Sequence, residues 1–354
     1  MKRILVYISA FALFNPFVAN AELQMYVPTG TANDLVIIDL NTDKVTGRIP
    51  ELENAHGLAA SPNSDYLVAG SMQPIGTGVV SGATKPSAVS EAEHAAHHAA
   101  GSPESGTTTP SYVSIVHPEH GHVMRRVAVR GITHHTAVSP DGVVAIAVHS
   151  GAGGISVIDL VSMSVVKEVQ TGRSPNYALF SSDGGRLYVS NAFSGTVSEI
   201  NVSDWTVKRE LAVGKEPEHM ALSSDDKKLF VANVGDGQVV AVDLNSGKIR
   251  KRYTVGREPH GIDVSNDGRW LFVTSKGDGK LLRFDLQSGE QRAVDLQPAP
   301  YHLDYVDAVN KLYVSSRKEP KIWVIDPQAL AVRGEIAIGK GVAHQMVILN
   351  RKGK

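Results

Sequence analysis

The feature that most constrains the fold of this chain is a repeat of about 42 residues. Four segments align with one another: SPNYALFSSDGGRLYVSN from Ser174, EPEHMALSSDDKKLFVAN from Glu216, EPHGIDVSNDGRWLFVTS from Glu258 and APYHLDYVDAVNKLYVSS from Ala299. Their prolines are separated by 42, 42 and 41 residues and are Pro175, Pro217, Pro259 and Pro300. A period of this size is typical of propellers and other repeat arrays.

Each repeat unit consists of short apolar runs divided by tight turns. The runs are rich in Val, Ile, Leu, Phe and Tyr, and the turn signals include Asp183-Gly184, Ser246-Gly247 and Asp267-Gly268. Four short strands joined by tight turns form one blade of a β-propeller. No segment keeps a 3.6-residue apolar period long enough to form a helix, which argues against a helical repeat.

Three further copies extend the repeat to both ends of the chain: NAHGLAASPNSDYLVAG from Asn54, ITHHTAVSPDGVVAIAV from Ile132 and VAHQMVILN from Val342. The residues after position 21 supply only the later strands of a blade, so we expect the strand near His344 to complete the N-terminal blade. Such a strand would close the ring and remove its exposed edges. The sequence therefore predicts an all-β fold, a single seven-bladed β-propeller over residues 22–354.

The aligned units resemble the YVTN family of seven-bladed propellers, whose repeats follow the pattern P-x-G-I-A-V-S-P-D-G-x-x-L-Y-V-x-N. HGIDVSNDGRWLFVTS and HHTAVSPDG match this pattern closely, and the resemblance covers nearly all of residues 22–354. The resemblance implies the propeller fold. It leaves the activity open, because this fold hosts many functions.

Residues 1–21 have the composition of a secretory signal peptide. Lys2 and Arg3 precede an apolar run from Ile4 to Phe14, and the small-residue triplet Ala19-Asn20-Ala21 follows. The apolar run is too short to span a bilayer, and no later stretch approaches the roughly 18 apolar residues that a spanning helix needs. We expect an exported protein, periplasmic or secreted, without a membrane span.

Charge and cysteine content exclude several classes of protein. The net charge of −1 becomes about −3 without Lys2 and Arg3, so nothing favours a nucleic-acid partner. Because the chain has no cysteine, it forms no disulfide, no thiolate metal site and no covalent c-type haem. It also has no G-x-S-x-G, P-loop or H-E-x-x-H motif, so no catalytic residue is predicted.

Histidines recur at the start of the predicted inner strands. We define a first column as the position after the proline: His56, His134, Asn176, Glu218, His260, Tyr301 and His344. The second column is the next position: Gly57, His135, Tyr177, His219, Gly261, His302 and Gln345. Inner strands converge around a central channel, so these residues should gather at one of its mouths. Neutral imidazoles suit zinc, copper and nickel, and the predicted metal ligands are therefore His56, His134, His135, His219, His260, His302 and His344.

A structural role for the histidines is the alternative. Each ring could hydrogen-bond the neighbouring blade or cap a turn. Successive residues of a strand point to opposite sides, so both columns are not expected to face the channel. Three or four of the seven histidines would suffice as ligands of tetrahedral zinc.

An insertion at 73–110 is expected to form a flexible loop between the second and third strands of its blade. It is rich in Gly, Ser, Thr, Pro and Ala. Its histidines His94, His97 and His98 are spaced so that they could collect metal above the channel, and His149 is expected on the same face. A solvated linker without function is the alternative.

Charged residues also recur with the repeat. A basic collar at the same mouth, made by Arg173, Lys215, Arg257 and Lys340, could hold carboxylates of a ligand or balance nearby acidic residues. Repeated aspartates are expected to hydrogen-bond backbone groups in the turns that follow them, and they are Asp39, Asp159, Asp243, Asp285 and Asp326.

Histidine placement resembles that of periplasmic zinc-chaperone propellers, which carry His-rich flexible segments and hand zinc to the binding protein of a transporter. That resemblance implies a monomeric, non-catalytic propeller that stores or delivers zinc, or copper. More distant resemblances are to nitrous-oxide reductase and to haem d1 propellers, but both carry an electron-delivering domain that this chain lacks. Two alternatives stay open: a tetrapyrrole site of the haem d1 type, with Arg173, Lys215 and Arg257 pairing with its carboxylates, and a metal-free binding scaffold.

Overall fold

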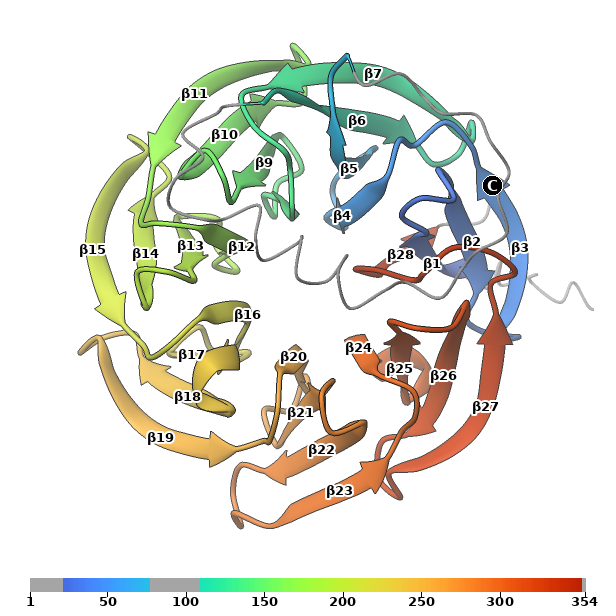
Figure 1. Cartoon of the computed structure of the whole chain (residues 1–354), viewed down its shortest axis with the longest axis vertical. Coiled ribbons are helices and arrows are strands. Elements are labelled where there is room, and N and C mark those ends of the chain that lie inside the picture. The colour runs from blue at the N-terminus through green and yellow to red at the C-terminus, as the bar shows by residue number, and fades with distance from the viewer. Residues whose placement is uncertain (1–21, 77–108, 352–354) are drawn as a thin grey trace, which may run out of the picture.

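The chain folds into a seven-bladed β-propeller, as the repeat predicts. The computed structural model describes residues 22–76 and 109–351, which form seven four-stranded antiparallel sheets around a central axis (Figure 1). The predicted signal peptide, together with His94, His97 and His98, lies outside these residues. None of the helices in the described part of the chain is long and apolar enough to cross a membrane.

The strands of the first four blades follow one another from the axis outwards. They are β28 (Val347–Arg351), β1 (Glu22–Pro28), β2 (Leu35–Asp39) and β3 (Lys44–Ile49); β4 (Ala55–Ala59), β5 (Leu67–Pro74), β6 (Ser111–His117) and β7 (His122–Val129); β8 (Thr136–Val138), β9 (Val144–His149), β10 (Gly154–Asp159) and β11 (Ser164–Gln170); β12 (Pro175–Phe180), β13 (Arg186–Asn191), β14 (Thr196–Asn201) and β15 (Thr206–Ala212).

The remaining three blades repeat this order. They are β16 (Pro217–Leu222), β17 (Lys228–Asn233), β18 (Gln238–Asp243) and β19 (Lys248–Thr254); β20 (Pro259–Val264), β21 (Trp270–Ser275), β22 (Lys280–Asp285) and β23 (Gln291–Asp295); β24 (Pro300–Val306), β25 (Lys311–Ser316), β26 (Lys321–Asp326) and β27 (Ala331–Ala337). Two short 3₁₀ helices, η1 (Val234–Asp236) and η2 (Asp307–Val309), follow β17 and β24.

The ring is closed by its last strand. β28 pairs antiparallel with β1, and Met25 stands opposite Ile348 in their register. The N-terminal blade therefore takes its inner strand from the C-terminal end of the chain, which confirms the predicted closure. Closure removes the exposed sheet edges that an open ring would leave.

The hydrophobic core is divided into seven layers, one between each pair of neighbouring blades. In one layer, Phe272 of β21 packs with Leu303 and Leu312 of the next blade. Middle strands are buried on both faces and are accordingly continuous apolar runs, whereas the outer strand β19 exposes most of its residues. The packing holds the inner strands in fixed positions around the channel.

The insertion joins β5 to β6, the second and third strands of its blade. The two strands continue as a pair up to Pro74 and Ser111, and the Ile75 amide donates to the Pro110 carbonyl at 2.8 Å. The repeated aspartates lie where the turns require them, since each accepts a backbone N–H from the turn that follows. Their donors are the amides of Asn41, Ser162, Ser246, Gln287 and Gln328. This confirms their predicted structural role.

Candidate metal centre

A β-bulge at the start of the inner strands decides which side chains enter the channel. In β20, Pro259 pairs with Ser275 and Ile262 with Val273, so that two residues, His260 and Gly261, stand opposite one. The same shift occurs in β4, β12, β16 and β24. In every case the two bulged residues are those of the first and second columns. A bulge interrupts the alternation of a strand and re-aims its side chains.

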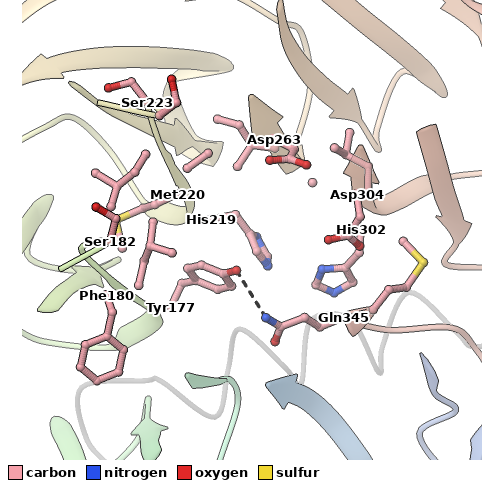
Figure 2. A pocket seen from close by; sticks show the side chains of 18 of the residues that line it. Tyr177, Phe180, Ser182, His219, Met220, Ser223, Asp263, His302, Asp304 and Gln345 are labelled. Atoms are coloured by element: carbon pink, nitrogen blue, oxygen red, sulfur yellow. Dashed lines mark hydrogen bonds between the residues drawn. The ribbon is translucent and has the colours of Figure 1, made fainter. Parts of the chain in front are cut away.

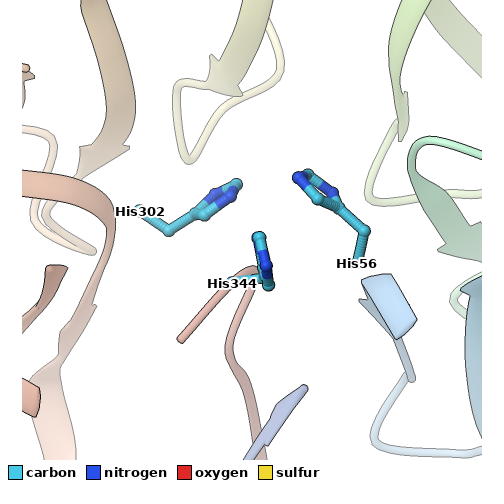
Figure 3. Close-up of side chains that lie close together, drawn as sticks. All are labelled: His56, His302 and His344. Carbon is cyan, nitrogen blue, oxygen red and sulfur yellow. The ribbon is translucent and has the colours of Figure 1, made fainter. Parts of the chain in front are cut away.

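Side chains from both columns consequently reach the channel, which corrects the expectation that strand alternation would turn one column away. His56 and His344 belong to the first column and His302 to the second, yet their rings converge (Figure 3). The extra backbone amide of the bulge donates to a hydroxyl on the second strand in three blades. The amides of Tyr177, Gly261 and His302 bond Ser190, Thr274 and Ser315 respectively.

The seven histidines of the two columns form a continuous cluster inside the channel. Each retains no more than 8% of its solvent exposure, so the cluster is buried. Ring centroids of His56 and His344 are 4.2 Å apart, and those of His219 and His260 are 4.1 Å apart. At such distances, nitrogen atoms of neighbouring rings lie close enough to share one ligand.

Three overlapping groups within this cluster have the spacing of a metal site. In each group, one ligand atom per residue lies within 4.8 Å of the others, and the groups are His56, His302 and His344; His135, His219 and His302; Glu218, His219 and His260. His302 and His219 each belong to two groups. These buried clusters could hold a metal ion.

The clearest pair is formed by His135 and His219, whose Nε2 atoms are 3.2 Å apart. The Nδ1 atom of His135 lies 2.9 Å from the Asn176 carbonyl oxygen. A carbonyl oxygen only accepts, so Nδ1 carries the hydrogen and Nε2 presents its lone pair to His219. Two nitrogens at about 2.05 Å from a tetrahedral zinc ion would be about 3.3 Å apart, close to the observed separation.

Two other histidines are oriented in the same way. The Nδ1 atom of His56 lies 3.2 Å from the His134 carbonyl oxygen, and that of His260 lies 3.4 Å from the Glu218 carboxylate. Metal-binding histidines usually direct their second nitrogen to a carbonyl or carboxylate, which fixes the tautomer and the ring orientation. The backbone and Glu218 thus fix the Nδ1 side of His56, His135 and His260. The Nε2 atom of His56 lies 3.3 Å from the Tyr301 hydroxyl.

Several ring nitrogens of the cluster lack a partner. Within the described residues, Nδ1 of His219 and Nε2 of His260 and of His302 are buried and make no hydrogen bond. Buried polar atoms are nearly always satisfied, so three such atoms in one cluster call for a ligand. A metal ion is the ligand that accepts lone pairs from several imidazoles at once.

Burial keeps these imidazoles neutral. It lowers the pKa of His219 to about 3, and it lowers the pKa of His135, His260 and His302 well below the usual value, with further lowering by the charge of neighbouring histidines. Burial also raises the pKa of Glu218, while the nearby Lys276 opposes that shift. These four histidines are therefore available as unprotonated ligands at neutral pH.

Glycine occupies the second column where the next inner strand comes too close for a side chain. A Cβ atom on Gly57 would lie 2.6 Å from the His135 Cα, and one on Gly261 would lie 2.3 Å from the Tyr301 carbonyl oxygen. Both distances are shorter than a carbon atom tolerates. The two glycines therefore permit the close approach of strands that brings histidines of neighbouring blades together.

His149 lies apart from the cluster. Its Nε2 is 2.7 Å from the Ser156 hydroxyl, which donates to Glu168, and its Nδ1 is 3.4 Å from the Ile132 carbonyl oxygen. The corresponding residue of the next blade, Asn191, makes the equivalent bond to Ser198. His149 thus occupies a position that serves strand-to-strand bonding within a blade.

The predicted basic collar lies on the loops that lead into the inner strands, and its members are exposed. The Arg257 guanidinium donates to Asp278 at 2.7 Å, and the backbone amides of Lys215 and Arg257 donate to Asp236 and Asp278. A Cβ on Gly256 would lie 2.2 Å from the Asp278 carboxylate. The glycine therefore leaves room for the aspartate that accepts the backbone amide of the basic residue after it.

A cavity of about 380 Å³ reaches the cluster from the far ends of the inner strands. His219 and His302 belong to its lining, as do Asp263 and Asp304 (Figure 2). Burial raises the pKa of Asp263 to about 6, and it raises that of Asp304 further, with repulsion from Asp263 adding to the shift. A cation between the two carboxylates would offset this repulsion.

Several residues of the site were not predicted as site residues from the sequence. Tyr177 and Gln345 stand in the second column beside the histidines and bond each other at 3.3 Å (Figure 2). Glu218 stands in the first column. Asp263 and Asp304 occupy the fourth position after the repeat proline, where the units at Pro175 and Pro217 have Leu179 and Ala221. An aspartate at a repeat position that is apolar in the other two units was the sequence signal for these two site residues.

A propeller with a buried histidine cluster in its channel is the class that this geometry defines. The family model described as "Lactonase, 7-bladed beta-propeller" matches residues 132–316, and the chain belongs to that family. No curated protein matches the chain significantly.

Solved structures of similar fold have low sequence identity to this chain. A hydrazine synthase from Kuenenia stuttgartiensis is 16% identical with a TM-score of 0.65, over 92% of this chain and 100% of that one. A periplasmic gluconolactonase from Pseudomonas aeruginosa is 16% identical with a TM-score of 0.68, over 92% and 99%. A putative 6-phosphogluconolactonase from Bacteroides uniformis is 15% identical with a TM-score of 0.69, over 93% and 100%. At these identities the likeness extends to the fold alone.

Proposed function

We propose that this protein is an exported propeller that binds zinc, or copper, in its channel histidine cluster and stores or delivers the metal. The observation that carries the proposal is the common orientation of His56, His135 and His260. Each directs Nδ1 to a carbonyl or carboxylate oxygen. The Nε2 atom of His56 then lies 3.3 Å from the Tyr301 hydroxyl and that of His135 lies 3.2 Å from the His219 ring, while that of His260 has no hydrogen bond among the described residues. Packing alone would not require the same tautomer in three separate blades.

The donor set favours zinc and copper over harder ions. Neutral imidazoles suit these metals, whereas magnesium and calcium prefer oxygen ligands. The triads share His219 and His302, so occupation of one triad withdraws a ligand from the next. Shared ligands favour transfer between neighbouring positions, which suits a protein that hands its metal to a partner such as the metal-binding protein of a transporter. The signal-like residues 1–21 support a periplasmic or secreted location.

Metal titration tests this function. The protein, prepared without an affinity His-tag and freed of metal, is titrated with Zn²⁺ and separately with Cu²⁺ in competition with a chromophoric chelator. We expect at least one tightly bound ion, lost in the double variant His135→Ala/His219→Ala. The matched control is His149→Asn, which takes the residue found at the same position of the next blade and should bind metal normally. Equal binding by wild type and the double variant would refute the proposed site.

Hydrolysis of a sugar lactone is a second candidate function. Its support is the family model together with the cavity, in which Asp263 with a pKa of about 6 lies near a second carboxylate and could act as a general base. Proton release from glucono-1,5-lactone, followed by a pH indicator with the metal-free and metal-loaded protein, tests this candidate. Turnover that is lost in Asp263→Asn would support it.

The tetrapyrrole and scaffold alternatives make different predictions for the purified protein. A tetrapyrrole held near Arg173, Lys215 and Arg257 would give a visible absorption band that weakens when these residues are replaced. A scaffold would show neither absorption nor metal binding. Recording the absorption spectrum beside the metal titration separates all three cases.

A further inference from the structure

The cavity next to the histidine cluster extends from the later residues of the inner strands to His219 and His302. It is built by the later halves of β12, β16, β20 and β24 and by the segment before β28. These strand ends lie on the side of the channel away from Pro74 and Ser111, where β5 ends and β6 begins. His219 and His302 form its inner end, and each retains only 3% of its exposure.

The lining of this cavity is acidic in its residue types. It contains the carboxylates Asp226, Asp263 and Asp304 and neither lysine nor arginine. Asp226 is occupied structurally, since it accepts the backbone amide and the hydroxyl of Ser182. Asp263 accepts the amides of Val264 and Tyr305 at 2.8 Å each, which fixes its side chain. In the described part of the chain, the side chain of Asp304 makes no hydrogen bond or ion pair.

Two unpartnered nitrogens lie at the inner end of the same cavity. Nδ1 of His219 and Nε2 of His302 are buried without a hydrogen bond among the residues described, and both side chains belong to the cavity lining (Figure 2). An ion that enters the cavity from the far ends of the inner strands would therefore meet the carboxylates before the imidazoles. Oxygen donors bind a hydrated cation through its waters, whereas imidazoles bind zinc and copper directly.

We propose that this cavity is the port by which a hydrated divalent cation enters the histidine cluster, with Asp263 and Asp304 holding it first. The proposal rests on the proposed metal-binding function. A cation with six waters of about 30 Å³ each needs roughly 200 Å³, which the cavity provides. Water ligands then leave as His219 and His302 coordinate the ion. Because the imidazoles are neutral, this exchange releases no proton from them.

The rate of metal loading tests the port. The metal-free protein is mixed with Co²⁺ in a stopped-flow instrument, and the visible absorption of the bound ion is followed at several salt concentrations. The double variant Asp263→Asn/Asp304→Asn should load at least about tenfold more slowly at low salt, and its rate should lose most of its salt dependence. Its final Co²⁺ content should equal that of wild type. Asp304→Asn alone, which breaks no hydrogen bond of the described structure, should give an intermediate rate.

The control variant Asp295→Asn/Glu51→Gln removes the same charge from exposed positions outside the cavity and should load at the wild-type rate. Wild-type loading by the Asp263/Asp304 variant would overturn the port and leave the metal site intact. A lower final Co²⁺ content in that variant would also overturn it, because the aspartates would then be ligands of the final site. Failure of the wild-type protein to bind any Co²⁺, Zn²⁺ or Cu²⁺ would overturn the proposed function itself.

Discussion

The Nε2 atoms of His135 and His219 lie 3.2 Å apart in the channel, although the two residues are 84 positions apart in the chain. One blade, β12–β15, lies between the blades of these two residues, and the ring brings their inner strands together. The His135 tautomer is set by the Asn176 carbonyl, so its lone pair faces His219. The other histidines of the cluster surround this pair.

Replacement of the shared ligand should be more damaging than replacement of a neighbouring histidine. His302 belongs to two of the three triads, whereas His134 belongs to none of those found among the described residues. We expect His302→Ala to weaken zinc binding by about 100-fold or more and His134→Ala by tenfold at most. Chelator competition measures both affinities. Equal losses in the two variants would contradict the assignment of His302.

The carboxylate behind His260 should tune the affinity of the site. Glu218 lies 3.4 Å from the His260 Nδ1, and Glu218→Gln keeps the size of the side chain but removes its charge. We expect zinc affinity to fall by about tenfold, because the imidazole loses a partner that raises its basicity. Thermal unfolding of the metal-free variant provides the control. An unchanged affinity in a folded variant would rule out this role for Glu218.

The buried histidines should make the metal-free protein sensitive to acid. The folded-state pKa of His219 is about 3 and the ordinary value is 6.5, so between these values the unfolded chain binds the extra proton. His219 therefore lowers the free energy of unfolding progressively as the pH falls below 6.5.

His219→Gln removes this penalty and introduces the residue that the last repeat carries as Gln345. Between pH 7.5 and pH 5, the variant should gain about 2 kcal/mol relative to wild type. Urea unfolding of both metal-free proteins at the two pH values measures the difference. A constant difference across this range would show that His219 titrates normally.

Close approach of neighbouring inner strands should depend on glycine. In Gly261→Ala the new Cβ would lie 2.3 Å from the Tyr301 carbonyl oxygen, so we expect destabilisation of about 1–3 kcal/mol and weaker metal binding. Gly334→Ala on β27 is the matched control, because no atom lies within 4 Å of its added Cβ. Thermal unfolding compares the two variants, and similar stability would indicate that the strands can separate without cost.

The repeat made most of the fold predictable. Evenly spaced prolines and turn residues defined the blades, and the incomplete first blade required a strand from the C-terminal end, which β28 supplies. The columns also located the histidines that now cluster. Simple strand alternation failed at His260 and Gly261, because the bulge depends on the pairing of β20 with β21, and pairing cannot be read from one strand alone.

The burial of the histidine cluster could likewise not be predicted from the sequence. Residues at the start of inner strands were expected at a mouth of the channel, and the burial of all seven histidines was not anticipated. The cavity that reaches His219 and His302 is lined by later residues of the inner strands. Asp263 and Asp304 fall at one repeat position, yet only the assembled ring places them beside His219 and His302. Their importance follows from contacts between blades, which a single repeat does not contain.

Anomalous diffraction from crystals of the zinc-loaded protein, recorded above and below the zinc absorption edge, shows directly whether the channel histidines bind the metal. We expect an anomalous peak in the channel, within about 2.1 Å of the Nε2 atom of His135 and of one ring nitrogen of His219. A peak confined to the surface, or a histidine cluster without a peak at saturating zinc, would contradict this prediction.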